Sequence, residues 1–268
     1  MEKIAVIGAG NIGEALISGL VDSGVEPRSI TATNRNKDRS RYLAERYGVS
    51  TGSDNREAAE EAAAVFLCVK PDQIPDTIEE ISGRLEGSED AAVLISMAAG
   101  VSLATMEESV SAAGSPIVRV MPNTPMLVGK GVLAVCYGRF VTDEQRELVR
   151  RLLGAAGLVV EVDESKMDAV TALCGSGPAY YFLLTEALVD AGVSLGLPRE
   201  LAQQLAGATA AGAGAMLEQG TSPVELRASV SSPAGTTVAA IREFEVSGLR
   251  GAVYRATEAC AQRSTQLG

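Results

Sequence analysis

The chain has 268 residues, no histidine and a formal net charge of −11 at pH 7. This length accommodates two domains and a substantial core. The acidic balance argues against nucleic acid or an anionic membrane as a partner, because a basic surface is missing.

Four cysteines stand far apart, at positions 68, 136, 174 and 260. No CxxC pair or dense spacing marks a disulfide framework, so we expect a reduced cytoplasmic protein whose four thiols are buried. No basic stretch with an apolar run and a small-residue cleavage site opens the chain, so we expect no signal peptide. We also expect no metal site.

A glycine-rich turn follows the first predicted strand, residues 3–7. Gly8 would allow the tight turn, Gly10 the close approach of a pyrophosphate, and Gly13 the packing of a helix over 14–20 on the strand. This setting is typical of a dinucleotide-binding fingerprint, with the phosphates at the helix N-terminus. The alternative is a glycine-rich turn without a ligand. The fingerprint predicts cofactor contacts from Gly8, Ala9, Gly10, Asn11 and Ile12.

The segment about 20 residues further on indicates which nicotinamide cofactor binds. An acidic residue there would hold the ribose hydroxyls, but the sequence has Thr33, Asn34 and Arg35. Arg35, supported by Lys37, Arg39 and the Thr33 hydroxyl, is predicted to bind a 2′-phosphate through charge-assisted hydrogen bonds. We therefore expect NADP as cofactor, with NADPH preferred over NADH. The alternative is that these cations lie on a solvated helix start.

Strand and helix patterns keep alternating after this first unit. Apolar runs at 65–69, 92–95 and 116–120 are separated by helical stretches at 75–85 and 103–113. This alternation predicts an α/β fold with a Rossmann-like, doubly wound sheet. Ligands bind at the carboxyl ends of the strands in such sheets. One cleft is therefore expected from residues 8–13, 33–35, 70–71, 97–100 and 121–123.

The sheet pattern ends with strands at 132–136 and 158–162, which flank a charged helix over 143–153. Strand patterns then disappear. The sequence therefore predicts a dinucleotide-binding domain over 1–162 and an all-helical C-terminal domain over 163–268.

The helical domain begins with a predicted helix from 178 to about 191, which we expect Gly192 to end. Further helices are expected to start at 197–198, at 222–223 and after 232–237. The uncharged run over 201–217 contains two glutamines and three glycines, which favours a packed helix over a membrane span. Its small residues allow the close approach of a helix from a second subunit.

Six motifs together resemble the pyrroline-5-carboxylate reductase family over essentially the whole chain. They are GAGNIGEALISGL at 8–20, CVKP at 68–71, MAAGV at 97–101, VMPNTP at 120–125, GSGPAYYF at 175–182 and SSPAGTT at 231–237. The resemblance implies NAD(P)H-dependent reduction of the cyclic imine 1-pyrroline-5-carboxylate to L-proline, the last step of proline biosynthesis. It also implies that the helical domain binds substrate and interlocks with a partner in a dimer, often assembled further into a decamer.

Two positions depart from the family pattern. Ala234 stands where many members have glycine, and alanine fits if its backbone keeps a negative φ. Ser229 stands where some relatives have an asparagine that contacts the cofactor, so we do not include it among the candidates.

Imine reduction suits a chain without histidine. The imine nitrogen can bind a proton before the hydride arrives, so the enzyme mostly has to orient the substrate over the nicotinamide. Thr237 resembles the family's threonine beside the ring nitrogen and is the catalytic candidate; the alternative is that it is only a helix N-cap.

The substrate carboxylate is expected at the same turn. Backbone N–H groups of Gly235, Thr236 and Thr237 at a helix start can bind an anion, and Ser232 adds a hydroxyl. Glu164 aligns with a family position near the substrate amine, where a negative charge would favour a protonated ring nitrogen.

The remaining cofactor candidates lie mostly near strand ends. Lys70 is predicted to face the cofactor phosphates or ribose, although a solvated lysine is the alternative. Asn55 resembles the family's contact to the adenosine half, and the Asn123 amide can pair with the nicotinamide carboxamide. The set is completed by Cys68, Val69, Pro71, Ala98 and Ala99.

Two other functions stay open at this point. A β-hydroxyacid dehydrogenase-like oxidoreductase shares the architecture but needs a lysine after its second glycine-rich motif, and no lysine follows Lys166. A non-enzymatic regulator would bind NADPH without turnover.

Overall fold

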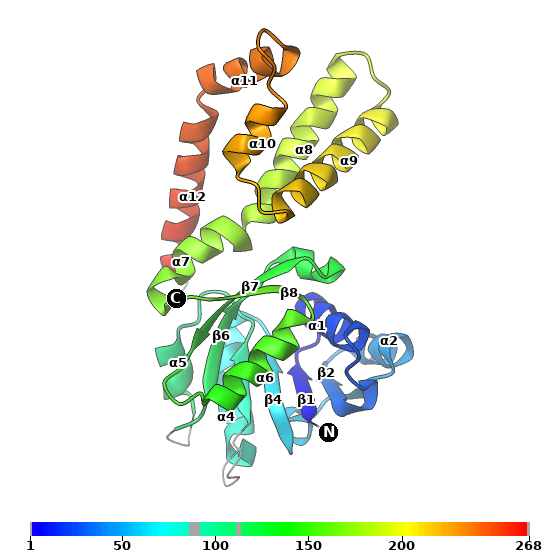
Figure 1. The fold of residues 1–268 in the computed structure, drawn as a ribbon. Coiled ribbons are helices and arrows are strands. Elements are labelled where there is room, and N and C mark those ends of the chain that lie inside the picture. Colours follow the sequence, from blue (N-terminus) through cyan, green and yellow to red (C-terminus); the bar gives the residue numbers. More distant parts are fainter. Residues whose placement is uncertain (1, 86–91, 111–113, 267–268) are drawn as a thin grey trace. The chain divides into compact units, whose positions relative to one another are not determined.

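The chain divides into two compact units in a computed structural model that describes residues 2–85, 92–110 and 114–266 (Figure 1). Unit 1 comprises Met1–Gly175 and Cys260–Gly268, and unit 2 comprises Ser176–Ala259. Residues 260–266, near the end of the sequence, thus belong to the first unit.

Unit 1 contains a sheet in which eight strands are described, in the order β3-β2-β1-β4-β5-β6-β7-β8. Neighbouring strands are parallel except β6 and β7, which are antiparallel. The doubly wound prediction is confirmed, but it missed the short edge strand β3. The strands are β1 (Lys3–Ile7), β2 (Ile30–Thr33), β3 (Ser50–Gly52), β4 (Ala62–Leu67), β5 (Val93–Ser96), β6 (Ile117–Met121), β7 (Gly131–Tyr137) and β8 (Gly157–Glu161).

Two hydrophobic cores cover the two faces of this sheet. Because side chains alternate along a strand, Ile4 and Val6 enter one core whereas Ala5 and Ile7 enter the other. The first core includes residues of α1 (Asn11–Asp22), α2 (Lys37–Tyr47) and α6 (Asp143–Gly154). The second includes residues of α3 (Asn55–Ala59), α4 (Ile74–Leu85) and α5 (Leu103–Glu108). The helix predicted over 103–113 ends earlier, and its residues 111–113 lie outside the described part of the chain.

The strand order reverses beside β1, which pairs with β2 on one side and β4 on the other. Gly8 follows β1 with a φ of +78°, and a Cβ there would lie 2.5 Å from Cγ1 of Val69. A Cβ on Gly13 would lie 3.2 Å from Cγ1 of Val6, so this glycine lets α1 pack on the strand. Near a Cβ on Gly10, by contrast, the closest atom would be the Gly8 carbonyl oxygen at 3.8 Å. The loop is tight where it meets the sheet and open at its tip.

Helices account for the described chain beyond β8, as predicted. They are α7 (Met167–Val170), a π-helical turn over Thr171–Gly175, α8 (Gly177–Ser194), α9 (Arg199–Glu218), α10 (Pro223–Ser229), α11 (Thr236–Val246) and α12 (Leu249–Thr265). The expected end of α8 at Gly192 is wrong. A Cβ on Gly192 would lie 3.2 Å from the Cβ of Ala202 on α9, so this glycine serves the packing of α8 against α9.

Unit 2 leaves much of its apolar surface exposed. Tyr181, Phe182 and Leu183 on α8 are about two-thirds exposed in the single chain, at 65%, 66% and 67%. On α9, a Cβ on Gly207 or Gly214 would have no described atom within 4 Å. Packing among the described residues therefore buries only about a third of these three side chains and does not require glycine at positions 207 and 214.

The cysteines differ from the expectation of four buried thiols. Cys136 is buried, but Cys68, Cys174 and Cys260 are each partly exposed, and none of the four forms a disulfide. Among the helices of the described residues, none is both long and apolar enough to cross a membrane.

Candidate functional site

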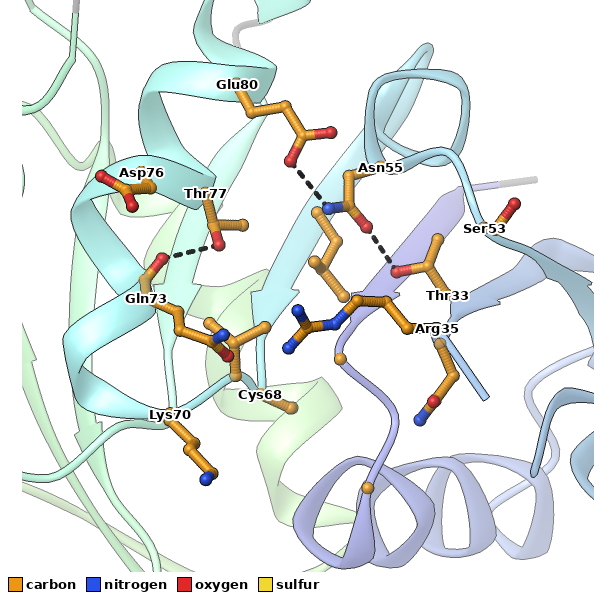
Figure 2. Close-up of a pocket in the computed structure, with 15 residues that line it drawn as sticks. Thr33, Arg35, Ser53, Asn55, Cys68, Lys70, Gln73, Asp76, Thr77 and Glu80 are labelled. Carbon is orange, nitrogen blue, oxygen red and sulfur yellow. Dashed lines mark hydrogen bonds between the residues drawn. The ribbon is translucent and has the colours of Figure 1, made fainter. Parts of the chain in front are cut away.

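A cleft of about 390 Å³ lies in unit 1, where the chain leaves the carboxyl ends of β1, β2 and β4 (Figure 2). Nine of the predicted cofactor residues line it, from segments separated in the sequence. They are Gly8, Gly10, Thr33, Asn34, Arg35, Asn55, Cys68, Val69 and Lys70. The convergence expected at the strand ends is therefore present for the first three of the five segments.

Seven predicted cofactor residues do not line this cleft: Ala9, Asn11, Ile12, Pro71, Ala98, Ala99 and Asn123. The side chain of Ala9, in the glycine-rich loop, is fully buried, and Ile12 packs against the first core. Ala98 is buried beyond β5, whereas Pro71 and Ala99 are exposed. Asn11 is the first residue of α1 and is exposed.

The N-terminus of α1 offers donors to an anion. Its N-cap residue is Gly10, which has no side chain to cap the helix. The first N–H groups of a helix lack intrahelical acceptors, so those of Asn11 and Ile12 need a partner. Together with the open space at Gly10, this end of α1 fits the pyrophosphate of a dinucleotide.

Arg35 is exposed at the cleft and forms no ion pair with the described residues. The three groups that were predicted to support Arg35 at a 2′-phosphate are arranged differently in the structure. Lys37 does not line the cleft, Arg39 is paired with Glu14, and the Thr33 hydroxyl donates to Oδ1 of Asn55 at 2.7 Å. Arg35 thus supplies a guanidinium group to the cleft, but the predicted neighbouring cations and hydroxyl do not assist it there.

Residues of α4 and of the short turn before it, over Pro71–Gln73, complete the cleft and were not predicted from the sequence. Gln73, Asp76, Thr77 and Glu80 line it together with Ser53. Glu80 accepts a hydrogen bond at 2.9 Å from Nδ2 of Asn55, so the Asn55 amide is fixed between Thr33 and Glu80 (Figure 2). Positions 73, 76, 77 and 80 have the spacing of one helical face and come shortly after a strand end. This spacing could have predicted that they line the cleft.

Cys68 and Lys70 follow β4 along the floor of the cleft. Burial raises the pKa of the Cys68 thiol to about 12, so this group stays protonated and uncharged near neutral pH. Lys70 is exposed at the start of a short turn over Pro71–Gln73. The cleft therefore carries positive charge from Arg35 and Lys70 and negative charge from Asp76 and Glu80.

Asn123 and Glu164 both hold segments of unit 1 together. The Asn123 amide donates to the Cys174 carbonyl at 3.0 Å and accepts from the Val132 N–H at 2.8 Å. The Glu164 carboxylate accepts from Nη1 of Arg119 at 2.9 Å and from the Leu103 N–H at 2.7 Å. Its charge is already balanced by a nearly buried guanidinium, which the sequence did not indicate.

The turn before α11 in unit 2 has a backbone that the sequence did not predict. Ala234 has a φ of +59°, so the expectation of a negative φ is wrong. A left-handed backbone conformation raises the energy of any residue that has a Cβ. Ala234 adopts it because the turn before α11 requires this conformation. A Cβ on Gly235 would lie 2.5 Å from Oγ of Ser232 and 3.0 Å from the Ser232 carbonyl oxygen, so a larger residue here would require Ser232 to shift.

The N-terminus of α11 is also open. Gly235 is its N-cap and provides no side-chain cap, so the alternative that Thr237 is only the N-cap is wrong. The N–H of Gly235 donates to the Ser232 carbonyl at 3.0 Å, which removes it from the expected set of anion donors. The N–H groups of Thr236 and Thr237 stand in the first turn, where no intrahelical acceptor is present.

Comparisons with known proteins agree over the whole chain. A family model described as pyrroline-5-carboxylate reductase dimerisation matches residues 164–267, and one described as NADP oxidoreductase coenzyme F420-dependent matches residues 3–100. A pyrroline-5-carboxylate reductase of Corynebacterium melassecola is 58% identical over 269 residues, which cover 100% of this chain and 99% of that protein.

Solved structures give the same result. A pyrroline-5-carboxylate reductase from Coxiella burnetii has a TM-score of 0.94 at 39% identity, covering 100% of this chain and 98% of its own. The Plasmodium falciparum pyrroline carboxylate reductase, solved with NADP bound, has a TM-score of 0.87 at 30% identity, again covering 100% and 98%.

Proposed function

This chain belongs to the pyrroline-5-carboxylate reductase family, and we propose that it reduces the cyclic imine 1-pyrroline-5-carboxylate to L-proline with NADPH. The full-length match at 58% identity carries this proposal. It favours this reaction over the β-hydroxyacid dehydrogenase-like alternative, whose architecture is similar.

The residues of the cleft fit a dinucleotide. When bound, NADPH would supply the hydride that reduces the imine carbon. The N–H groups at the start of α1 would hold the pyrophosphate, and Arg35 would hold the 2′-phosphate that distinguishes NADPH from NADH. Asn55 and Lys70 would contact the adenosine half and the ribose or phosphates. The remaining predicted contacts, from Ala9, Ile12, Pro71, Ala98, Ala99 and Asn123, stay predictions.

The turn before α11 is proposed to bind the substrate carboxylate. The N–H groups of Thr236 and Thr237 are the available donors, and the exposed Ser232 adds a hydroxyl. Thr237 is proposed to hydrogen-bond the ring nitrogen through its hydroxyl. Glu164 remains a candidate for favouring the protonated ring, although Arg119 balances its charge.

The chemistry places few demands on acid catalysis. A protonated imine accepts a hydride at carbon, and the C=N electron pair then becomes the nitrogen lone pair of a secondary amine. No further proton has to be delivered in that step, so a chain without histidine can catalyse it by orienting the two reactants.

The decisive experiment follows the absorbance of NADPH with pyrroline-5-carboxylate, and of NADP with a 3-hydroxy acid as the matched control. We expect NADPH consumption with formation of proline, and no reaction with the hydroxy acid. Turnover of the hydroxy acid alone would support the dehydrogenase, and NADPH binding without any turnover would support the regulator.

Replacing Arg35 by alanine tests the cofactor preference. We expect the KM for NADPH to rise about tenfold, roughly 1.4 kcal/mol, while the KM for NADH stays nearly unchanged. Lys37→Ala is the matched control, because Lys37 does not line the cleft. Equal effects of Arg35→Ala on both cofactors would remove the basis for the proposed preference.

We further propose that the chain forms a dimer through its helical part, as the matching family description suggests. The exposed apolar side chains of α8 and the open glycines of α9 support this assembly. The decamer and the cytoplasmic location stay predictions.

A further inference from the structure

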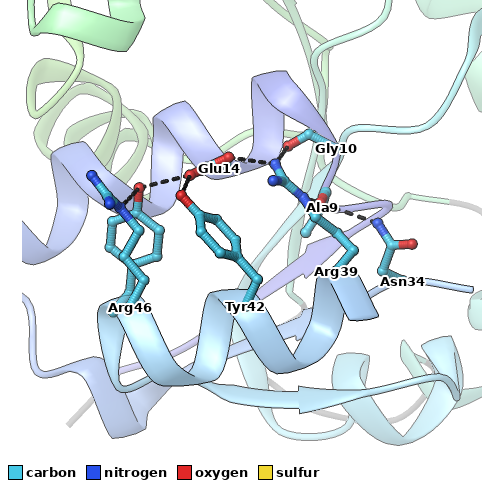
Figure 3. Close-up of polar contacts among 8 residues, drawn as sticks. Ala9, Gly10, Glu14, Asn34, Arg39, Tyr42 and Arg46 are labelled. Atoms are coloured by element: carbon cyan, nitrogen blue, oxygen red, sulfur yellow. Dashed lines mark hydrogen bonds and ion pairs between the residues drawn. The ribbon is translucent and has the colours of Figure 1, made fainter. Parts of the chain in front are cut away.

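Arg39 on α2 holds the glycine-rich loop by its backbone (Figure 3). Its Nε donates to the Ala9 carbonyl at 3.3 Å, and its Nη2 donates to the Gly10 carbonyl at 3.0 Å. Nδ2 of Asn34 donates to the same Ala9 carbonyl at 3.1 Å. The loop before α1 is therefore tied to side chains from a different helix and from the end of β2.

Glu14 on α1 fixes the same guanidinium. Its carboxylate forms an ion pair with Nη2 of Arg39 and accepts from the hydroxyls of Tyr42 at 3.0 Å and Tyr47 at 2.9 Å. The side chains of Glu14 and Arg39 are only 17% and 23% exposed. Burial alone would raise the pKa of Glu14, but hydrogen bonds from Tyr47, Arg39 and Tyr42 outweigh it and hold this pKa below its ordinary value. The carboxylate therefore stays ionised beside Arg39.

We infer that Arg39 is a positioning residue for the pyrophosphate site, and that Glu14, Tyr42 and Tyr47 hold it in place. The inference rests on the proposed binding of NADPH. A trans peptide unit is planar, with its C=O and N–H directed oppositely. The Gly10 carbonyl accepts from the Glu14 N–H at 2.9 Å, and Arg39 adds a second hydrogen bond to it. Both bonds stabilise the orientation in which the N–H of Asn11 points toward the open end of α1.

Charge gives Arg39 a second effect on the cofactor. Glu14 is an acidic residue in the first turn of α1, the end at which the pyrophosphate would bind. Its negative charge repels a phosphate unless a cation balances it. Loss of Arg39 would therefore remove one of the two hydrogen bonds that hold each loop carbonyl, and it would leave a partly buried carboxylate uncompensated near the anion site.

This role differs from the one expected for Arg39 in the sequence, where it supported a 2′-phosphate site. The two roles predict different ligand dependence. A pyrophosphate-positioning residue affects NADPH and NADH alike and leaves 2′-AMP, which lacks any 5′-phosphate, untouched. A ligand of the 2′-phosphate affects NADPH and 2′-AMP and spares NADH.

The test compares Arg39→Ala, Arg35→Ala and the double variant Glu14→Gln/Arg39→Ala in the full chain. Dissociation constants of NADPH and NADH come from nicotinamide fluorescence, and that of 2′-AMP from competition with NADPH. Wild-type binding and reduction of pyrroline-5-carboxylate are measured first, so failure of the proposed function is recognised separately.

For Arg39→Ala we expect both NADPH and NADH to bind about tenfold more weakly, with 2′-AMP unchanged. Glu14→Gln in the same chain should recover part of that loss, because it removes the uncompensated charge. Tyr47→Phe, which removes one hydrogen bond to Glu14, should give a smaller loss that is again equal for both cofactors, and it tests the inference even if Arg39→Ala unfolds. Selective weakening of NADPH and 2′-AMP, unchanged affinities, or absence of recovery in the double variant would each overturn the inference.

Discussion

Glycines in the two units have different surroundings. In unit 1, a Cβ on Gly19 would lie 2.7 Å from the Ala155 carbonyl oxygen, and one on Gly131 would lie 2.7 Å from the Cβ of Met126. In unit 2, Gly207, like Gly214 beside it on α9, has open space where a Cβ would be. These two glycines of unit 1 serve packing within the chain, whereas these two of unit 2 lie in the region that matches a dimerisation family model and have no described atom at the Cβ position. The comparison teaches which of these glycines packing within the chain explains and which it does not.

The largest effect is expected for Gly207→Leu, which tests the comparison between the glycines of the two units. Leucine has a higher helix propensity than glycine, and its Cβ would have no atom of the described residues within 4 Å outside its own helix backbone, so the single chain should fold. The added side chain cannot fit a close helix crossing between subunits. We expect monomers or aggregates in sedimentation. Gly154→Leu on α6, which also has open space at its Cβ, should leave the assembly intact.

A Gly207→Leu protein that remains a fully active oligomer would show that this face of α9 is not the association surface. In that case the open glycines of unit 2 would lose their explanation, and the contrast with unit 1 would no longer hold.

Thr237→Ala tests whether unit 2 acts on the substrate while unit 1 binds the cofactor. We expect turnover to fall by about 10- to 100-fold, roughly 1.4 to 2.7 kcal/mol, because the substrate's own proton and the orientation by the turn remain. The affinity for NADPH should not change, since the cofactor cleft lies in unit 1. Thr236→Ala, which keeps the N–H and alters the neighbouring hydroxyl, is the control. Complete loss of turnover would instead indicate acid catalysis by Thr237.

Gly19→Ala should destabilise unit 1 by about 1–3 kcal/mol through overpacking, as measured by urea unfolding. The loss should not depend on protein concentration, because the clash is within one chain. Gly154→Ala is the matched control and should change stability by less than about 0.5 kcal/mol. If Gly19→Ala left the free energy of unfolding unchanged, the packing around Gly19 would have room for a Cβ, and the contrast with Gly207 would not hold.

Ala234→Gly has the smallest expected effect. Since Ala234 has a φ of +59°, glycine should stabilise the protein by about 0.5–1 kcal/mol. Urea unfolding at a fixed protomer concentration measures this. Ala239→Gly, inside α11, should destabilise by about 1 kcal/mol and shows that the gain is specific to the left-handed position. A loss of stability for Ala234→Gly would contradict the strain at this turn.

Much of unit 1 was predictable because buried parallel strands appear as continuous apolar runs. β3 escaped prediction because its three residues, none of them buried, carry no such run. The antiparallel direction of β7 was also hidden, since an apolar alternation is the same in either direction. The strand-end residues of the cleft were predictable from topology, as Gly8 and Cys68 show.

Other parts of the site depend on contacts between distant segments. Glu80 enters the cleft from α4, and only its helical spacing from positions 73, 76 and 77 distinguishes it in the sequence from a surface glutamate. The ion pair between Arg39 and Glu14 was not predicted, because the two residues lie 25 positions apart in the sequence. Ala234 was expected at negative φ because local preference says so, and the turn it occupies outweighs that preference.

The hydrogen bonds of Asp168 have a consequence for the order in which the protein is made. Its carboxylate accepts from the hydroxyls of Ser264 at 2.7 Å and Thr265 at 2.9 Å. These two hydrogen bonds join the start of α7 to the end of α12, and all three residues belong to unit 1. A ribosome therefore releases all the described strands of the sheet early, yet adds the residues that anchor α7 only after unit 2 has been translated. Synthesis of the cofactor cleft precedes completion of the unit that carries it.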